Sequence, residues 1–439
     1  MMTVDLLLKN GIVISEGREQ VRSVAISRGR IDGVFSESDA PDSQETLDCR
    51  GLYILPGAID IHVHLRDLNE SRKEDYYSGT RAAAAGGVTS VVDMPNSNPP
   101  VLANDVLEEK IEIARLERYV NIGFYAGISK DTQNLEWSKK SKILGLKVYP
   151  HNPLDNGVSY TNERILECSR IAKEVELPLL FHPDSSDPSA SPVNNDDFFR
   201  LHSCSKELDA TRRFIDAHKE VGNRLHVCHV SCATTMKLIS ENRAEMNLTA
   251  EVTPHHLFLN SVDSVHEDGT AKTLPPLRSP YDSKVLLEGL KTCTIDCVVS
   301  DHAPHLDEEK KKAFLEAPSG IPGLETLVPL LLTEVFSGRL TWAEYLRACS
   351  SGPALLMGLG NKGLLAAGYD ADLMIVRRQA SEIQGERFFS KAKITPFEGA
   401  EVLAKLITTI VDGQVIYSEG EFMVEPGMVG RVPLMKNVL

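Results

Sequence analysis

The segment Ala58-Ile-Asp-Ile-His-Val-His64 decides how the middle of this chain can fold. It begins as an apolar run of strand length and ends in two histidines two positions apart. Alternate side chains of a strand point to the same side, so His62 and His64 can bind one ion together. A doubly wound open sheet, the structural alternative, would carry a Gly-x-Gly-x-x-Gly turn at this place. The segment therefore favours a strand whose carboxyl end carries chemistry.

Seven further apolar runs of strand length follow, at Val88–Asp93, Val120–Ala126, Ile143–Tyr149, Pro178–His182, Leu225–His229, Leu248–Val252 and Asp296–Asp301. Stretches of helical character separate most of them, at Leu107–Arg118, Asn162–Glu176, Lys206–Val221 and Ser283–Lys291. Eight strands that alternate with helices over about 300 residues predict an α/β fold, a (β/α)8 TIM-type barrel.

Both ends of the chain read differently from the middle. Short strands with turn residues occupy the first part, where Asn10-Gly11 follows Asp5–Lys9, and the last part, where Asp412-Gly413 lies inside Val411–Tyr417. Asn-Gly and Asp-Gly favour hairpins, so we expect an antiparallel sheet. We predict a small β-sandwich domain formed by both termini, with residues 1–57 as its N-terminal part, 58–365 as the barrel and 366–439 as its C-terminal part.

Composition narrows the class of protein. The 439 residues carry a net charge of −15, which disfavours nucleic acid and anionic lipid as partners. No apolar run reaches the ~20 residues of a membrane span, and the first residues lack a basic signal-peptide region. The eight cysteines are scattered, without a Cys-x-x-Cys pair. This cysteine pattern predicts a cytoplasmic protein. A small-molecule substrate and a possible homodimer are further expectations that do not follow from composition.

Metal-binding types of side chain collect at the predicted strand ends. In a barrel these ends converge on one face, where catalytic residues lie. A single histidine there could be a hydrogen-bonded core residue, but a whole set on one rim favours a metal centre. The candidate ligands are His62, His64, Lys147, His182, His229 and Asp301.

Lys147 is an unusual member of this set, because a protonated amine has no lone pair for a metal. Its neighbours Leu146 and Val148 are apolar, and burial would lower its pKa and expose a nucleophilic amine. Reaction with CO2 would give a carbamate that can bridge two cations ~3.5–4 Å apart, with a hydroxide between them. A snorkelling or salt-bridged lysine is the alternative.

Asp301 follows an apolar strand and opens a loop. Its carboxylate could bind a metal and also accept the proton of the attacking hydroxide. The alternative is a helix cap, but the next predicted helix starts several residues later.

Longer motifs resemble those of dihydroorotases, cyclic amidohydrolases of the amidohydrolase superfamily. They span nearly the whole chain and include His62-Val-His-Leu-Arg-Asp67, Lys73-Glu-Asp75, Ala82-Ala-Ala-Ala-Gly-Gly-Val-Thr89, Asp93-Met-Pro-Asn96, Glu251-Val-Thr-Pro-His-His-Leu257, Ser300-Asp-His-Ala-Pro-His305, Gly320-Ile-Pro-Gly-Leu-Glu-Thr326 and Gly368-Tyr-Asp-Ala-Asp-Leu373. The Ser-Asp-His-Ala-Pro-His motif is more specific than the His-x-His pair.

The resemblance implies a zinc-dependent enzyme of pyrimidine biosynthesis that reversibly cyclises N-carbamoyl-L-aspartate to L-dihydroorotate. It implies two Zn²⁺ per chain, bridged by carboxylated Lys147, with Asp301 as catalytic acid and base. The first zinc would be held by His62, His64, Lys147 and Asp301, and the second by Lys147, His182 and His229. Arg66, Asn96 and His305 match positions that bind the substrate carboxylate. A surface ion pair for Arg66 and a turn role for Asn96 are the alternatives.

Two departures from the family pattern leave questions open. Leu274 stands where relatives often have a polar or basic residue, and Arg278 could compensate. Asp155, in Asp155-Asn-Gly157, is a second candidate for the bridging ligand, whereas a structural or substrate-shaping role is favoured for His255 and His256.

Other functions also remain open. A hydantoinase, dihydropyrimidinase or allantoinase would use related rings, and a catalytically inactive scaffold would not turn over substrate at all. The arginine, asparagine and histidine clamp disfavours the first, and the complete ligand set disfavours the second.

Overall fold

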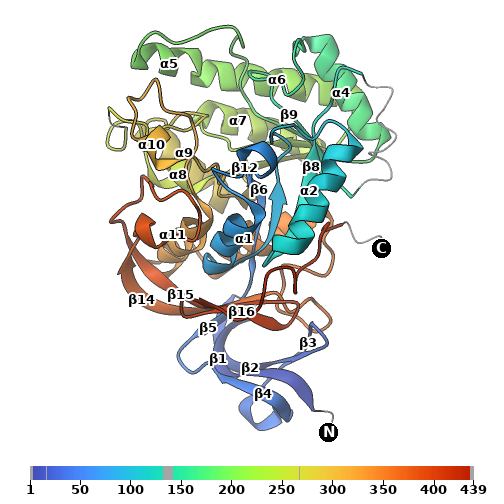
Figure 1. Cartoon of the computed structure of the whole chain (residues 1–439), viewed down its shortest axis with the longest axis vertical. Coiled ribbons are helices and arrows are strands. Elements are labelled where there is room, and N and C mark those ends of the chain that lie inside the picture. Colours follow the sequence, from blue (N-terminus) through green and yellow to red (C-terminus); the bar gives the residue numbers. More distant parts are fainter. Residues whose placement is uncertain (1–2, 16, 132–141, 266, 436–439) are drawn as a thin grey trace.

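The computed structural model describes residues 3–15, 17–131, 142–265 and 267–435. Eight parallel strands form a barrel in sequence order (Figure 1). They are β6 (Ala58–Val63), β7 (Val88–Asp93), β8 (Asn121–Ala126), β9 (Gly145–Val148), β10 (Leu179–Phe181), β11 (Leu225–Val227), β12 (Leu248–Val252) and β13 (Cys297–Val298). Beyond β13, His302 forms a parallel bridge with Val63, and the His64 N–H donates to the His302 carbonyl at 2.8 Å. The barrel predicted from the sequence is confirmed.

Helices between the strands cover the barrel. The longer ones are α1 (Tyr76–Ala85), α2 (Asn104–Glu117), α4 (Asn162–Glu174), α6 (Cys204–Val221), α7 (Ala233–Asn242), α9 (Pro280–Lys291) and α11 (Leu324–Phe336). Shorter ones are α5 (Asn195–Leu201), α8 (Pro254–Phe258), α10 (Asp307–Lys310), α12 (Trp342–Leu346) and α13 (Gly352–Met357). Local signals explain several boundaries: Ser279 caps α9 in a capping box with Pro280 at its first position, and Gly222 ends α6 in the left-handed region. In the part of the chain that the structure describes, no helix has the length and apolar character needed to span a bilayer.

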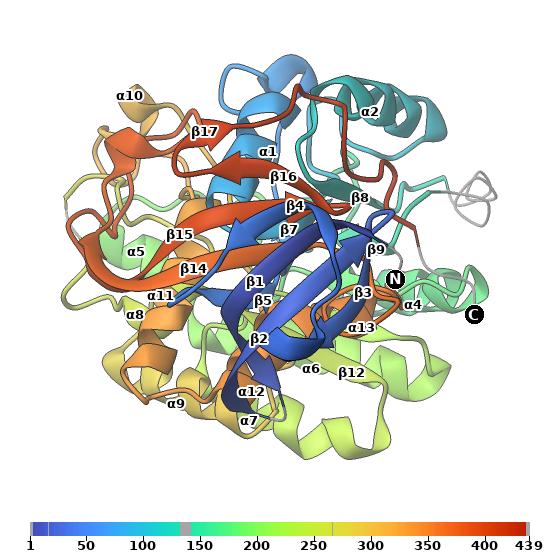
Figure 2. The same ribbon diagram turned by 90° about the horizontal axis from the view of Figure 1, so that it is seen from below.

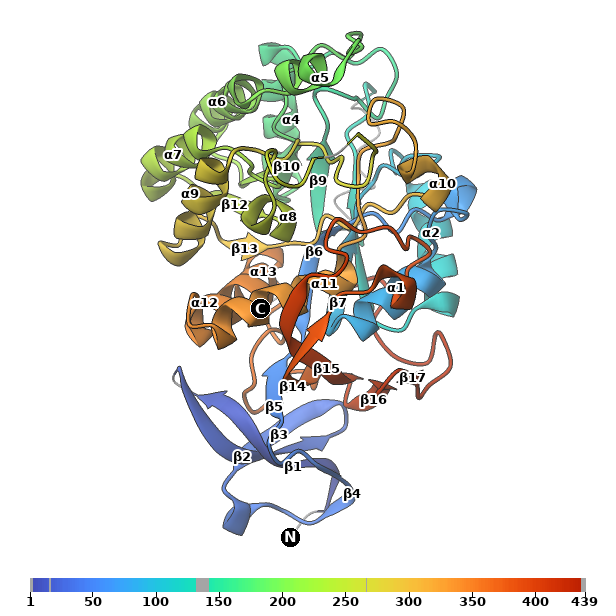
Figure 3. The ribbon, with the colours of Figure 1, turned by 90° about the vertical axis from the view of Figure 1, so that its left-hand side faces the viewer.

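Both ends of the chain join in one separate sheet below the barrel (Figures 1 and 3). Its strands are β1 (Val4–Ser15), β2 (Arg18–Ser27), β3 (Arg30–Phe35), β4 (Ser43–Asp48), β5 (Tyr53–Pro56), β14 (Leu373–Glu382), β15 (Glu401–Val411), β16 (Gln414–Ser418) and β17 (Glu421–Phe422). The order is β17-β16-β15-β14-β5-β1-β2-β3, with β4 also on β1. A sheet shared by the two termini was expected from their sequences. It is mixed rather than wholly antiparallel, because β4 and β5 run parallel to β1.

Of the two dipeptides predicted to form hairpin turns, Asp412-Gly413 forms one and Asn10-Gly11 does not. Asp412 and Gly413 both have positive φ, 48° and 76°, and connect β15 to β16 as the predicted hairpin. Asn10-Gly11 does not turn the chain, because β1 continues through it with a bulge between Leu8 and Gly11. A Cβ on Gly11 would lie 2.4 Å from Ile54 Cδ1, so close packing between strands requires glycine there.

The link between sheet and barrel fixes which rim is free. β5 runs into β6 through Gly57 alone, and a Cβ there would lie 2.2 Å from the Thr89 side chain. The amino ends of the barrel strands therefore face the sheet, which covers that end in Figure 2. The carboxyl ends face away from the sheet and are free to form a site.

The cysteines gave no sequence signal for a disulfide, yet Cys204 and Cys232 form one. It joins the first residue of α6 to the loop after β11, across 28 residues of sequence. The other six cysteines are free, and Cys293 is the exposed one among them.

A buried carboxylate anchors the segment after β14 to the barrel. Glu325, at the start of α11, accepts backbone N–H groups from Phe389 at 2.8 Å and Ser390 at 3.2 Å. Burial raises the pKa of Glu325 to about 8, although these N–H groups and Lys393 lower it. The folded protein therefore holds a proton here that the unfolded chain releases above its ordinary pKa of 4.5.

We expect this proton to make folding pH-dependent. Since the folded-state pKa is the higher one, the stability contribution is present below about pH 4.5 and is lost as pH rises to about 8, a loss of about 3–5 kcal/mol. Glu325→Gln keeps a carbonyl acceptor without the charge, so its stability relative to wild type should rise over this window. Urea unfolding at several pH values measures the difference, with Glu386→Gln, on the exposed part of the same segment, as control. A difference that does not change with pH would contradict the assignment.

Candidate metal centre and substrate pocket

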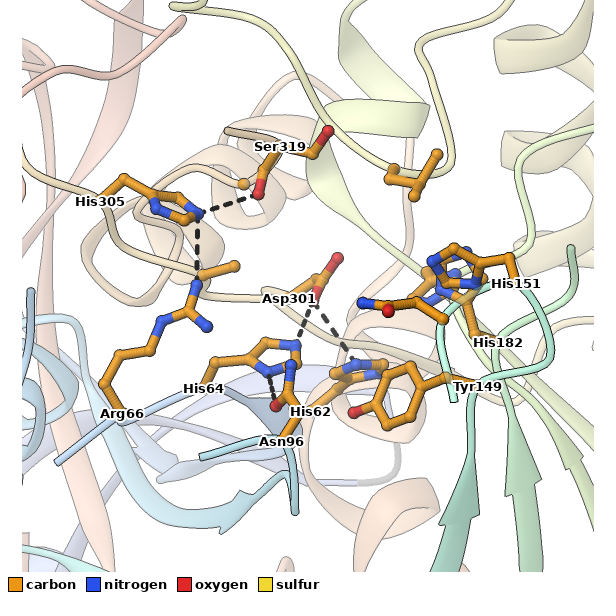
Figure 4. A pocket seen from close by; sticks show the side chains of 15 residues that line it. His62, His64, Arg66, Asn96, Tyr149, His151, His182, Asp301, His305 and Ser319 are labelled. Carbon is orange, nitrogen blue, oxygen red and sulfur yellow. Dashed lines mark hydrogen bonds and ion pairs between the residues drawn. The ribbon is translucent and has the colours of Figure 1, made fainter. Parts of the chain in front are cut away.

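A cavity of about 230 Å³ opens at the carboxyl ends of the barrel strands. All residues predicted for the site line it except Lys147, which is completely buried. In Figure 4, Arg66 and His305 lie on one side, His151 and His182 on the other, and Asp301 between them. The full lining is His62, His64, Arg66, Asn96, Tyr149, His151, Asn152, His182, His229, Leu274, Asp301, Ala303, His305, Ser319 and Gly320.

His62 in β6, His64 directly after it and Asp301 form the first candidate ligand group. Asp301 Oδ1 lies 3.2 Å from His64 Nε2 and 3.5 Å from His62 Nε2. The other ring nitrogen of each histidine has its own acceptor: His64 Nδ1 lies 2.6 Å from Asn96 Oδ1, and His62 Nδ1 contacts Glu251. When both Nδ1 atoms donate, both Nε2 lone pairs face the Asp301 carboxylate. Lone pairs that face one another in this way repel, and a cation bound between them would remove the repulsion.

His182 and His229 form the second group, and their ring centroids lie 4.5 Å apart. His182 directly follows β10, and His229 comes two residues after β11. Among the residues that the structure describes, neither His182 Nε2 nor His229 Nδ1 has a hydrogen-bond partner, although both atoms are buried. Burial lowers the pKa of both imidazoles well below the usual value, and Lys147 lowers it further. Neutral rings with a free nitrogen are suited to bind metal.

Lys147 projects from β9 and is completely buried. Its Nζ donates to Cys228 Sγ at 2.8 Å and lies 4.9 Å from the centroid of the Tyr149 ring. Within the described ranges, no carboxylate lies within 4.0 Å of this nitrogen, so the salt-bridged alternative has no support. Lys147 lowers the pKa of His62, His182 and His229, so it acts on residues of both ligand groups.

Glu251 orients both histidine groups and was not singled out from the sequence. From the end of β12 its carboxylate accepts from His62 Nδ1, from His226 Nε2 at 3.0 Å and from the His229 backbone at 3.2 Å. Burial would raise the pKa of Glu251, but His62 and His226 outweigh it, so the group is ionised. The signal that could have revealed it is an acid inside the apolar run 248–252.

Asp301 is held in an uncommon backbone conformation, with a φ of 46°. The preceding Ser300 N–H donates to the buried Asp60 carboxylate at 3.1 Å, which fixes this turn. Burial raises the pKa of Asp301, but positive charge on His62 and His64, when these rings are protonated, outweighs it and lowers the pKa to about 2. Arg66 and His229 also have positive φ, 56° and 31°. Strained non-glycine residues of this kind cluster at functional sites.

Arg66 and His305 place two nitrogen atoms close together on the opposite wall. Arg66 Nη2 lies 3.3 Å from His305 Nε2, and the same Nε2 lies 3.0 Å from the Ser319 carbonyl. Burial lowers the pKa of both side chains, and for His305 it falls to about 2 with help from Arg66 and Lys73. Arg66 is only 9% exposed, so the surface ion pair considered as its alternative does not occur.

The other candidates lie elsewhere or have structural roles. Asp155 is outside the pocket lining and accepts the Lys130 N–H at 2.8 Å. Leu274 lines the pocket, but Arg278 does not compensate for it, because its guanidinium donates to Ser231 and the His202 carbonyl.

The two adjacent histidines of α8 also differ in their contacts. His256 bonds to the Pro275 carbonyl at 3.1 Å, in agreement with a structural role. His255 keeps a buried Nε2 without a hydrogen-bond partner in the described ranges, and burial lowers its pKa to about 4.

Comparison with known proteins agrees with this arrangement. The amidohydrolase family model matches residues 53–416. A dihydroorotase of Methanosphaera stadtmanae is 34% identical over 433 residues, covering 95% of this chain and 97% of the relative. One of Staphylococcus epidermidis is 35% identical, covering 94% and 99%.

Solved structures extend the comparison to the fold. An L-hydantoinase (dihydropyrimidinase) from Arthrobacter aurescens has a TM-score of 0.91 and 25% identity, covering 98% of this chain and 99% of that one. A dihydropyrimidinase from Brevibacillus agri NCHU1002 has a TM-score of 0.87 and 26% identity, covering 98% of each chain. With near-complete coverage by dihydroorotases at higher identity, the chain belongs to the amidohydrolase family, as a cyclic amidohydrolase of the dihydroorotase group.

Proposed function

We propose that this chain is a zinc-dependent dihydroorotase, which interconverts N-carbamoyl-L-aspartate and L-dihydroorotate. The observation that carries the proposal is one pocket with two chemically different walls. Unpaired imidazole nitrogens and a carboxylate converge on one side, and a buried arginine meets a histidine on the other. The first is suited to cations and the second to a carboxylate.

The donor set fits two metal ions. His62, His64, Asp301 and Lys147 would hold one, and Lys147, His182 and His229 the other, with Lys147 as a carbamate. Bound zinc ions would polarise the amide carbonyl and lower the pKa of the attacking water. The fit rests on facing lone pairs at Asp301, free nitrogens on His182 and His229, and a buried lysine without a carboxylate partner in the described ranges.

The chain's own residues would orient the substrate and move the proton. His64 donates to Asn96 Oδ1, so the amide N–H donors of Asn96, a residue of the pocket lining, are not used by His64. Together with Arg66 and His305, Asn96 would bind the exocyclic carboxylate. Asp301, ionised by its histidine neighbours, would take the proton from water during ring opening and return it to the ring nitrogen.

A hydantoinase or dihydropyrimidinase is the second candidate, because the solved structures compared above carry those names. The rings of such substrates have no exocyclic carboxylate, and they would leave Arg66 buried without an anionic partner. Leaving a buried cation unsatisfied is costly, which favours a carboxylate-bearing ring.

The test compares substrates and an Arg66 variant. We expect turnover of dihydroorotate to exceed that of dihydrouracil and hydantoin. Arg66→Met should lower kcat/KM for dihydroorotate about 30- to 1000-fold, the effect of one charged, desolvated hydrogen bond of ~2–4 kcal/mol, with metal content unchanged. Arg72→Met removes a cation that is 83% exposed and serves as the matched control. Faster turnover of hydantoin than of dihydroorotate would refute the proposal.

A further inference from the structure

The side chain of Lys73 reaches the far side of the His305 ring from the pocket. Lys73 lies in the loop before α1, and its Nζ is 3.3 Å from His305 Nδ1. The opposite ring nitrogen, Nε2, is the one near Arg66 and the Ser319 carbonyl, both of which line the pocket. Lys73 is therefore outside the pocket lining but in contact with a residue that forms it.

The Lys73 and Ser319 contacts, one on each side of the ring, lead to the same position for its proton, whereas the Arg66 contact taken alone would leave Nε2 without a hydrogen. A lysine ammonium only donates, so Nδ1 must accept and carries no hydrogen. A carbonyl oxygen only accepts, so Nε2 must donate to Ser319 and carries the hydrogen. Because burial and nearby cations lower the pKa of His305 to about 2, the ring is neutral and has one proton to place.

In this tautomer, two donors face each other inside the pocket. The Nε2–H of His305 and the Nη2 group of Arg66 lie 3.3 Å apart, and neither can accept from the other. An oxygen anion placed beside both would accept from Arg66 Nη2 and share the Nε2 hydrogen with the Ser319 carbonyl. With the other tautomer, the pocket would present a lone pair, which repels a carboxylate.

A nearby carboxylate would favour that other tautomer. Glu309 Oε2 lies 3.6 Å from His305 Nδ1, and Glu309 Oε1 lies 3.6 Å from Lys73 Nζ. Without Lys73, Glu309 would be free to accept a hydrogen from Nδ1. Lys73 thus competes with Glu309 for Nδ1, and while the ammonium donates to this nitrogen the ring proton stays on Nε2.

We propose that Lys73 is a positioning residue, which holds the His305 ring with its proton on Nε2 and so gives the pocket a hydrogen-bond donor for a carboxylate. The identity of the carboxylate rests on the proposed function, but the tautomer does not. Lys73 thereby determines specificity without touching the substrate.

The tautomer is measured directly by ¹⁵N NMR of the histidine-labelled full chain, with the His305 signals assigned by their absence in His305→Asn. We expect a protonated Nε2 in wild type and in Lys73→Arg, and a protonated Nδ1 in Lys73→Met. An unchanged tautomer in Lys73→Met would overturn the proposal. This readout needs no turnover, so it stands even if dihydroorotate proves not to be the substrate.

Kinetics supply a second readout. Lys73→Met should raise KM for dihydroorotate roughly 10- to 100-fold, with a smaller effect on kcat, because a donor to the carboxylate becomes a lone pair. Adding Glu309→Gln should restore much of the loss, because a neutral amide attracts a proton to Nδ1 less strongly than a carboxylate does and still accepts the Leu306 N–H through its oxygen. Arg72→Met controls for loss of a neighbouring positive charge. Failure of Glu309→Gln to restore KM, with Lys73→Arg also inactive, would assign Lys73 a purely structural role and overturn the proposal.

Discussion

Asp301→Asn is expected to lower kcat about 10²- to 10⁴-fold, the range for removing a general acid and base, with little change in KM. The asparagine has the same shape, but it cannot accept a proton from water or return one to the ring nitrogen. In the folded chain Asp301 is ionised, since His62 and His64 bring its pKa to about 2. At neutral pH it is therefore in the ionised form, which is the form that can accept a proton during ring opening.

The matched control is Asp155→Asn, which changes the other aspartate considered as a ligand. Because Asp155 contacts Lys130 outside the pocket lining, this variant should keep its metals and nearly all activity. Rates in both directions and metal content per chain measure the outcome. If Asp155→Asn lost metal and activity while Asp301→Asn kept both, the assignment of the acid and base would have to be exchanged.

The barrel could be predicted because each buried parallel strand is a short apolar run set off by helical stretches. The last strand, where the barrel closes against its first strand, is less regular than the sequence indicated. The predicted strand 296–301 has only Cys297 and Val298 in ladder form, and Asp301 turns away at positive φ. The strand pairing with β6 is made instead by His302, which forms a β-bridge with Val63. No local sequence pattern reveals this contact. Asn10-Gly11 was misleading for a related reason, since a bulge and a hairpin share the same local signal.

The site residues also fall into those that the sequence could predict and those that it could not. Residues at strand ends could be placed in one pocket because barrel topology brings those ends together. Glu251 and Lys73 could not be assigned roles, because their importance comes from partners distant in sequence, His62 in one case and His305 in the other. Arg278 was considered as a replacement for the polar residue missing at Leu274, but it contacts Ser231 and Glu207 instead.

Lys147→Met should remove at least one metal and most activity, a loss of about 10³-fold or more if several kcal/mol of metal-derived stabilisation disappear. Methionine fills a similar volume and so avoids the cavity that alanine would leave in a completely buried position. It cannot form a carbamate. Metal analysis and thermal unfolding of the metal-free proteins separate loss of the ligand from loss of the fold.

The carbamate itself is tested by reconstitution. Metal-free wild type should regain activity with zinc faster in the presence of bicarbonate, because the buried amine must first capture CO2, whereas Lys147→Met should not respond. Lys147→Glu is the informative companion, since its carboxylate supplies an anion at the same position without CO2. Its recovery should be partial and independent of bicarbonate. The amine now contacts only Cys228 and the Tyr149 ring within the described residues, so no existing ion pair would have to break for carboxylation. A free amine detected at Lys147 in active enzyme with both metals bound would reject the bridge and leave the histidines and Asp301 to hold the ions alone.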